Sequence, residues 1–158
     1  MLTNADITLF NRYYDNDSGE YKYARTFLRA VNWQDSQAIN ISQSAGVKST
    51  NHTRVFIPLK VDSEEKTYLK PKTFKRSDKV TNYTLDNADI VVKGIVDFDM
   101  NDAHSGGFKA LLRDFDDVMK ITKVADNRYG SKLVQHFELE VESVSYTHLR
   151  AHETVLDL

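Results

Sequence analysis

The fold is decided by the stretch Asp86-Asn-Ala-Asp-Ile-Val-Val-Lys-Gly-Ile-Val-Asp97, which holds the densest run of β-branched residues in the chain. Such residues suit a pleated and largely buried strand. Asp86 and Asn87 in front of the run are turn residues, and Gly94 within it indicates a bulge or a close approach of backbones. The stretch therefore predicts a central strand over residues 88–97.

Alternating segments on both sides of this stretch are typical of further antiparallel strands. Residues 7–13 and 20–27 are joined by Asp15-Asn-Asp-Ser-Gly19, whose glycine permits a positive φ, so we expect a hairpin. The other predicted strands are residues 37–43, 53–61, 118–124 and 135–141, with a polar loop over 44–51. Pro58 cannot donate to a sheet ladder, so its strand must end, bulge or lie at an edge there.

One helix is predicted, over about residues 106–116, with Ser105 as its N-cap. Its apolar face comprises Phe108, Leu111, Leu112 and Phe115, spaced three and four residues apart. We expect Ile90 and Ile95 to pack on this face through Leu111 and Leu112, with Val91 or Val92 facing inward. We place Trp33, the only tryptophan, in the core, with a subunit contact as the alternative.

These elements predict a mainly β fold: a small antiparallel β-barrel or sandwich with one short helix and a long charged loop. The chain has 158 residues and a net charge of −2, which fits one domain without bulk affinity for nucleic acid. It contains no cysteine, which excludes disulfides and thiolate metal sites. No apolar run reaches the roughly 18 residues of a membrane helix, and the N-terminus lacks a signal-peptide pattern. We therefore expect synthesis in the cytoplasm and no membrane association.

The charged connection over residues 62–82 is the most basic part of the chain and longer than an ordinary loop. Its length indicates either a functional segment or a short helix after Pro71. The two interpretations are a solvated loop pinned by two aromatic residues and a contact surface for an acidic partner or DNA. Its basic residues include Lys66. The partner-binding hypothesis assigns the contact to Tyr68, Lys70, Lys72, Phe74, Lys75, Arg76 and Lys79.

Patterns that would indicate catalysis or metal binding fail on inspection. Residues 97–102 begin like a calcium loop, but Asp102 and Phe108 stand where glycine and glutamate are needed. The histidines before the C-terminal segment, His52, His104 and His136, lie in separate predicted elements. The sequence has no phosphate loop, dinucleotide fingerprint or nucleophile elbow. We therefore predict no catalytic residues, no cofactor and no metal, and a protein that is not an enzyme.

The C-terminal segment differs in character from the rest. Residues 144–154, Val-Ser-Tyr-Thr-His-Leu-Arg-Ala-His-Glu-Thr, resemble a one-frame translation of a transposase-type sequencing adapter, and Asp157-Leu158 fits its continuation. The alternative is a genuine C-terminal strand. We expect residues 1–143 to form a single β-rich domain, residues 144–158 to be a non-native tail, and the natural chain to end near Glu142.

A series of short motifs occurs in an order that points to a known family. They are Thr3-Asn-Ala-Asp-Ile-Thr-Leu9, Val31-Asn-Trp33, Val55-Phe-Ile-Pro58, Tyr68-Leu-Lys-Pro71 with Phe74, Asp89-Ile-Val-Val-Lys-Gly-Ile-Val96, Phe115-Asp-Asp-Val118, Asp126-Asn-Arg-Tyr-Gly-Ser131 and His136-Phe-Glu-Leu139. Over residues 3–142 the chain resembles short minor capsid or head–tail connection (neck) proteins of tailed bacteriophages and prophages of Gram-positive bacteria. Each motif alone is weak, and their order and spacing carry the resemblance.

The resemblance implies a non-enzymatic structural protein of the virion, made in the bacterial host cytoplasm. Its implied partners are capsid, portal, neck and tail proteins, with a homo-oligomeric ring as the expected assembly and DNA as a further candidate contact of the basic loop. Two alternatives remain open: a small β-sandwich module that binds a carbohydrate or peptide, and a phage-encoded regulator or inhibitor. Portal, capsid and tail genes beside the coding gene would favour the virion role.

Overall fold

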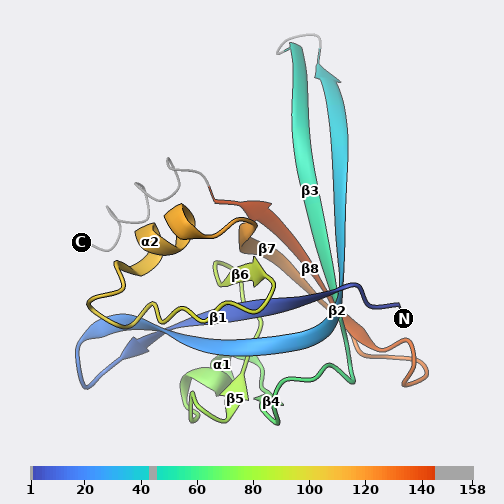
Figure 1. The fold of residues 1–158 in the computed structure, drawn as a ribbon. Helices are drawn as coiled ribbons and strands as arrows, with labels where there is room; N and C mark the ends of the chain where they lie inside the picture. The colour runs from blue at the N-terminus through green and yellow to red at the C-terminus, as the bar shows by residue number, and fades with distance from the viewer. Residues whose placement is uncertain (1, 43–45, 145–158) are drawn as a thin grey trace.

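A computed structural model describes residues 2–42 and 46–144; the adapter-like segment from residue 145 onward lies outside the described residues. Its main feature is a closed six-stranded antiparallel barrel with the strand order β1-β2-β3-β8-β7-β6 (Figure 1). The barrel strands are β1 (Ala5–Asp15), β2 (Glu20–Ser42), β3 (Gly46–Pro58), β6 (Ile90–Lys93), β7 (Val118–Asn127) and β8 (His136–Ser143). The predicted small antiparallel barrel, with little helix, is confirmed.

The barrel interior is filled by the inward-facing residues of all six strands, which alternate along each strand with outward-facing ones. Trp33 is only 4% exposed and belongs to this core, as predicted. The inward residues of the last strand are also the expected ones: Phe137, Leu139 and Val141. β3 ends at Pro58, which has no N–H to continue the ladder. The period-two pattern thus places the core side chains correctly wherever the strand is regular.

The central strand is shorter than predicted, because β6 covers only Ile90–Lys93. Gly94 follows it with φ +95°, a conformation that favours glycine, and its N–H donates to the Asp6 carbonyl at 2.6 Å. This turn breaks the alternation, so Ile95 is 39% exposed while Val96 is buried. The expected packing of Ile95 on the helix is therefore wrong, and Val96 takes that place.

A second apolar layer lies on the outer face of the barrel under helix α2 (Gly107–Asp114). Ile90, Val92 and Leu111 share this cluster, whereas Val91 belongs to the barrel interior, so both central valines are buried on opposite faces. Gly106 rather than Ser105 occupies the N-cap position, but the Ser105 hydroxyl accepts a hydrogen bond from the Gly107 N–H at 3.1 Å. The predicted helix and its apolar face are confirmed.

The charged connection folds onto the barrel instead of extending from it. It contains β4 (Thr67–Tyr68), which pairs in parallel with β5 (Asn82–Tyr83), and helix α1 (Pro71–Lys75), which begins at the proline. The Lys79 ammonium group donates to the carbonyls of Phe74, Lys75 and Ser77 and closes the C-terminal end of α1. The short helix after Pro71 is thus present.

A two-stranded arm projects from the barrel where β2 and β3 continue past their neighbours (Figure 1). We define the arm as residues 36–42 of β2 and 46–52 of β3, whose backbones pair with each other. β8 pairs with β3 only from Thr53 onward. The predicted loop over residues 44–51 is therefore wrong for residues 46–51, because β2 supplies a ladder partner that outweighs their polar composition; residues 43–45 lie outside the described part.

The packing of α2 predicts a large effect of shortening Leu111, which is fully buried. Leu111→Ala should lower the free energy of unfolding by about 2–5 kcal/mol, since it removes buried methyl groups and leaves a cavity. Urea denaturation measures this change. The matched control is Leu133→Ala, at a side chain that is 76% exposed, with an expected loss below about 0.5 kcal/mol. Equal effects of the two substitutions would contradict the packing of α2.

Candidate functional site

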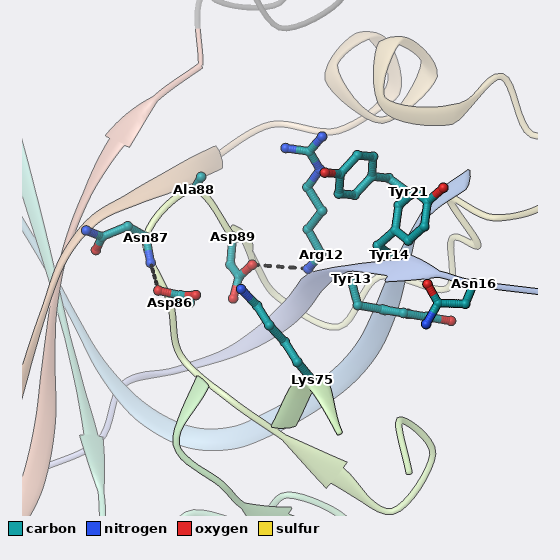
Figure 2. Close-up of a pocket in the computed structure, with 10 residues that line it drawn as sticks. All are labelled: Arg12, Tyr13, Tyr14, Asn16, Tyr21, Lys75, Asp86, Asn87, Ala88 and Asp89. Carbon is teal, nitrogen blue, oxygen red and sulfur yellow. Dashed lines mark hydrogen bonds between the residues drawn. The ribbon is translucent and has the colours of Figure 1, made fainter. Parts of the chain in front are cut away.

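A cavity with a volume of about 410 Å³ lies between β1, the β1–β2 turn, helix α1 and the turn before β6 (Figure 2). We call it the β1–α1 pocket. Its size falls within the range of small-molecule or peptide side-chain sites. Its wall combines aromatic, cationic, acidic and amide side chains. The lining residues are Arg12, Tyr13, Tyr14, Asn16, Tyr21, Lys75, Asp86, Asn87, Ala88 and Asp89.

Asp89 is the buried acid of this pocket, with 3% of its surface exposed. Its Oδ2 accepts a hydrogen bond from Asn11 Nδ2 at 2.8 Å and its Oδ1 accepts one from the Arg12 N–H at 3.1 Å. Burial disfavours the charged form and raises the pKa of Asp89 to about 7, although these two hydrogen bonds act in the opposite direction. The carboxyl group can therefore change its charge near neutral pH.

Asn11 holds Asp89 and the neighbouring backbone in place. It is fully buried, and its amide pairs twice with the Thr84 backbone: Nδ2 donates to the carbonyl at 2.7 Å, and Oδ1 accepts from the N–H at 3.2 Å. The sequence did not single out Asn11 or Asp89. A signal existed, because Asn11 continues the inward series of Ile7 and Leu9 as a polar residue at an apolar position.

Two cations line the pocket from separate elements. The Arg12 guanidinium lies 4.0 Å from the centre of the Tyr21 ring, and Tyr21 meets Tyr14 edge-on at 5.2 Å. The Arg12 Nε is buried without a hydrogen-bond partner among the described residues. Lys75 enters from α1, on the other side of the pocket (Figure 2). Neither cation forms an ion pair within the described ranges.

The structure divides the predicted partner-binding residues into two groups. Phe74 is 1% exposed within its own domain, and Tyr68 packs on Phe137 with ring centres 4.5 Å apart. Lys79 is engaged by the α1 carbonyls. Phe74 is therefore not available to a neighbour, and Tyr68, which stays partly exposed, packs on the barrel core; both pin the loop to its own barrel, as the alternative interpretation expects. The predicted residues that remain exposed are Lys70, Lys72, Lys75 and Arg76.

The acidic turn over residues 97–102, which begins like a calcium loop, has a structural role. The Asn101 side chain accepts from the Tyr23 N–H at 2.8 Å and donates to the Tyr23 carbonyl at 2.7 Å, which ties the turn to β2.

Among the described residues, no group of three or more histidine and carboxylate side chains is placed to hold a metal ion. Within the same residues, no helix is long and apolar enough to cross a membrane.

These features define a class of protein: a closed six-stranded barrel that carries a two-stranded arm and a polar pocket beside a basic helix. Residues 2–142 match the family described as a family of unknown function, DUF6751, and the chain belongs to this family. No curated protein and no solved structure shows a significant match to the chain.

The buried carboxyl group predicts a specific dependence of stability on pH. The pKa of Asp89 is higher in the folded state, about 7, than its ordinary value of 3.8, so the folded state binds the proton more tightly. The free energy of unfolding should therefore fall as pH rises from about 4 to 7, by on the order of 4 kcal/mol from this group. Urea denaturation at pH 4 and pH 8 measures the fall.

Asp89→Asn should remove most of this difference, because the replacement does not titrate. The new amide donor could also destabilise the folded state. That loss would lower the free energy of unfolding equally at both pH values, so the difference between them still reports the titration of Asp89. Asp17→Asn, at an exposed position in the β1–β2 turn, is the control and should keep the natural pH dependence. An undiminished difference in Asp89→Asn would show that Asp89 is not the responsible group.

Proposed function

We propose that this protein is a non-enzymatic structural component of a tailed-phage virion, at the head–tail connection or as a minor capsid protein. The ordered resemblance over residues 3–142 suggests the setting. The arm is the observation that carries the proposal, because it extends beyond the barrel and could contact a neighbouring protein. The expected assembly is a ring of identical subunits, with capsid, portal, neck or tail proteins as neighbours.

The arm differs from the barrel in how its backbone groups are satisfied. Every barrel strand pairs on both sides, whereas the arm strands pair only with each other over residues 36–42 and 46–52. A two-stranded ribbon is only marginally stable in water, and its outer edges offer unpaired N–H and C=O groups. Seven residues of strand reach about 20 Å. Pairing or packing against a neighbouring subunit would satisfy these edges and fix the arm.

The exposed face of α1 supplies a second surface for assembly. Lys72, Lys75 and Arg76 are exposed on or directly after this helix, in a protein with a net charge of −2. Such a local basic surface attracts an acidic partner and makes association sensitive to salt. Charge is the main feature of this surface, since Phe74 of the same helix is buried in the subunit.

A binding module is the second candidate, and the β1–α1 pocket is the observation that favours it. Its two cations form no ion pair within the described part of the chain, which favours a ligand-binding role over a purely structural one. The two candidates differ in where the protein is found: a virion component is retained in purified particles, whereas a regulator or soluble module is not.

Mass spectrometry of purified virions tests the proposal, with variants supplied in place of the natural protein. In the arm-shortened variant, Asn-Gly replaces residues 37–51, so a tight turn joins Ser36 to His52, which pair in the arm. The charge variant is K72E/K75E/R76E. Both should keep the barrel folded, as judged by circular dichroism and thermal melting, and both should be lost from particles.

The matched control is K60E/K123E/K132E, which reverses three exposed basic residues away from α1 and should be incorporated normally. Normal incorporation of the arm-shortened variant would contradict the role of the arm. Normal incorporation of K72E/K75E/R76E would remove the α1 surface from the proposal. Absence of the natural protein from intact particles would overturn the virion role and favour the regulator.

A further inference from the structure

We propose that the β1–α1 pocket binds an extended acidic peptide segment of a partner protein, with carboxylates at Arg12 and Lys75. The inference takes from the proposed function only that the protein binds other proteins, and it names the chemistry of one such partner. It rests on which side chains of the pocket already have hydrogen-bond or ion-pair partners within the subunit and which are available to a ligand.

The cations are the groups left for a ligand. The Arg12 guanidinium is positioned by the Tyr21 ring at 4.0 Å, and Lys75 by its place in the last turn of α1, yet neither has a carboxylate partner in the described chain. The Arg12 Nε is buried without a hydrogen-bond partner among the described residues, so a ligand carboxylate would meet the terminal nitrogens of the guanidinium. Because the two cations approach from different sides of the pocket (Figure 2), they suit two separate anionic groups better than one small anion.

The two acidic residues of the pocket form no ion pair with Arg12 or Lys75 among the described residues. Asp89 is bound to the Asn11 amide and the Arg12 N–H, and Asp86 accepts from the Asn87 N–H at 2.8 Å. They also limit the ligand, because two carboxyl groups on the wall would repel a closely spaced chain of phosphates. Carboxylates on alternate residues of a peptide, separated by neutral groups, carry fewer negative charges past these two carboxyl groups and are repelled less.

The aromatic residues argue against a nucleic-acid ligand. One face of Tyr21 is covered by Arg12, and Tyr14 meets Tyr21 at an interplanar angle of 74°. Single-stranded nucleic acids are held by bases stacked on free ring faces, and this arrangement occupies ring surface within the subunit. Tyr14 and Tyr21 are half-exposed and lie beside Arg12. Tyrosine and arginine are the residues enriched at the strongest contact points between proteins.

Amide side chains at the two ends of the pocket suit a peptide backbone. Figure 2 shows Asn87 at one end and Asn16 at the other, with the cations between them. An amide both donates and accepts, so each can pair with a peptide group of an extended segment. Lys72 and Arg76, exposed beside Lys75, would attract the acidic segment before it enters.

Fluorescence anisotropy with the full chain tests the inference. The probe is the labelled peptide Thr-Glu-Thr-Glu-Thr-Glu-Thr, and the comparison probes are the same peptide with Gln for Glu and a seven-residue oligothymidylate. The acidic peptide should bind with saturation and at least about tenfold more tightly than the Gln peptide, the factor expected for loss of one charge-assisted hydrogen bond.

R12Q and K75Q should each weaken binding of the acidic peptide about fivefold to tenfold, whereas the control K132Q, at an exposed lysine away from the pocket, should not. K75Q alters an exposed side chain and keeps the test valid even if R12Q is unstable. Tighter binding of the oligothymidylate, equal weakening by K132Q, or no binding of the acidic peptide would overturn the inference.

The peptide-binding experiment and the virion experiment can succeed or fail independently of each other. Pocket-dependent peptide binding by a protein that is absent from virions would support the inference and overturn the virion role. Failure of peptide binding, together with arm-dependent incorporation into particles, would do the reverse.

Discussion

The structure depends on the buried Asn11 amide, which completes the barrel where the backbone ladder between β1 and β6 stops. β6 pairs with β1 only from Ile7 to Phe10, and the chain before β6 then departs from the sheet. Asn11 replaces the missing ladder by pairing with both peptide groups of Thr84 and by holding the Asp89 carboxyl group. Without this amide, three buried polar groups would lose partners, at roughly 1–3 kcal/mol for each. Closure of the barrel and shape of the pocket therefore rest on the same side chain.

The same arrangement recurs at two other places where strands diverge. Asn4 accepts from the Trp33 N–H at 2.7 Å and donates to its carbonyl at 2.9 Å, and Asn101 pairs in the same way with Tyr23. A carboxamide has the donor and acceptor spacing of a peptide group, so it can extend a ladder from a segment that is not itself a strand. The N-terminal segment, the turn before β6 and the acidic turn are thus joined to the barrel by one kind of contact.

This recurring contact explains what could be predicted from the sequence and what could not. Regular strands, the first hairpin, the end of β3 at Pro58 and the apolar face of α2 follow from local alternation, spacing and turn residues, and all are confirmed. Asn11 and Asp89 could not be assigned, because their partners lie more than 70 residues away along the chain. The residues of the arm in β3 resembled a loop for a similar reason, since the backbone partner that makes them a strand is the facing segment of β2.

The positions of the arm and of α1 constrain how such a subunit could assemble. In Figure 1 the arm rises from one side of the barrel, and α1 lies on the other side. Two different surfaces in these positions are better suited to head-to-tail contacts, in which the arm of one subunit meets a different surface of the next. A two-fold contact would instead join identical patches. Head-to-tail contacts close into a ring when the rotation between subunits divides a full turn, and otherwise extend into a filament. A closed barrel suits the proposed role, because its own strands are paired on both sides while the arm keeps unpaired strand edges.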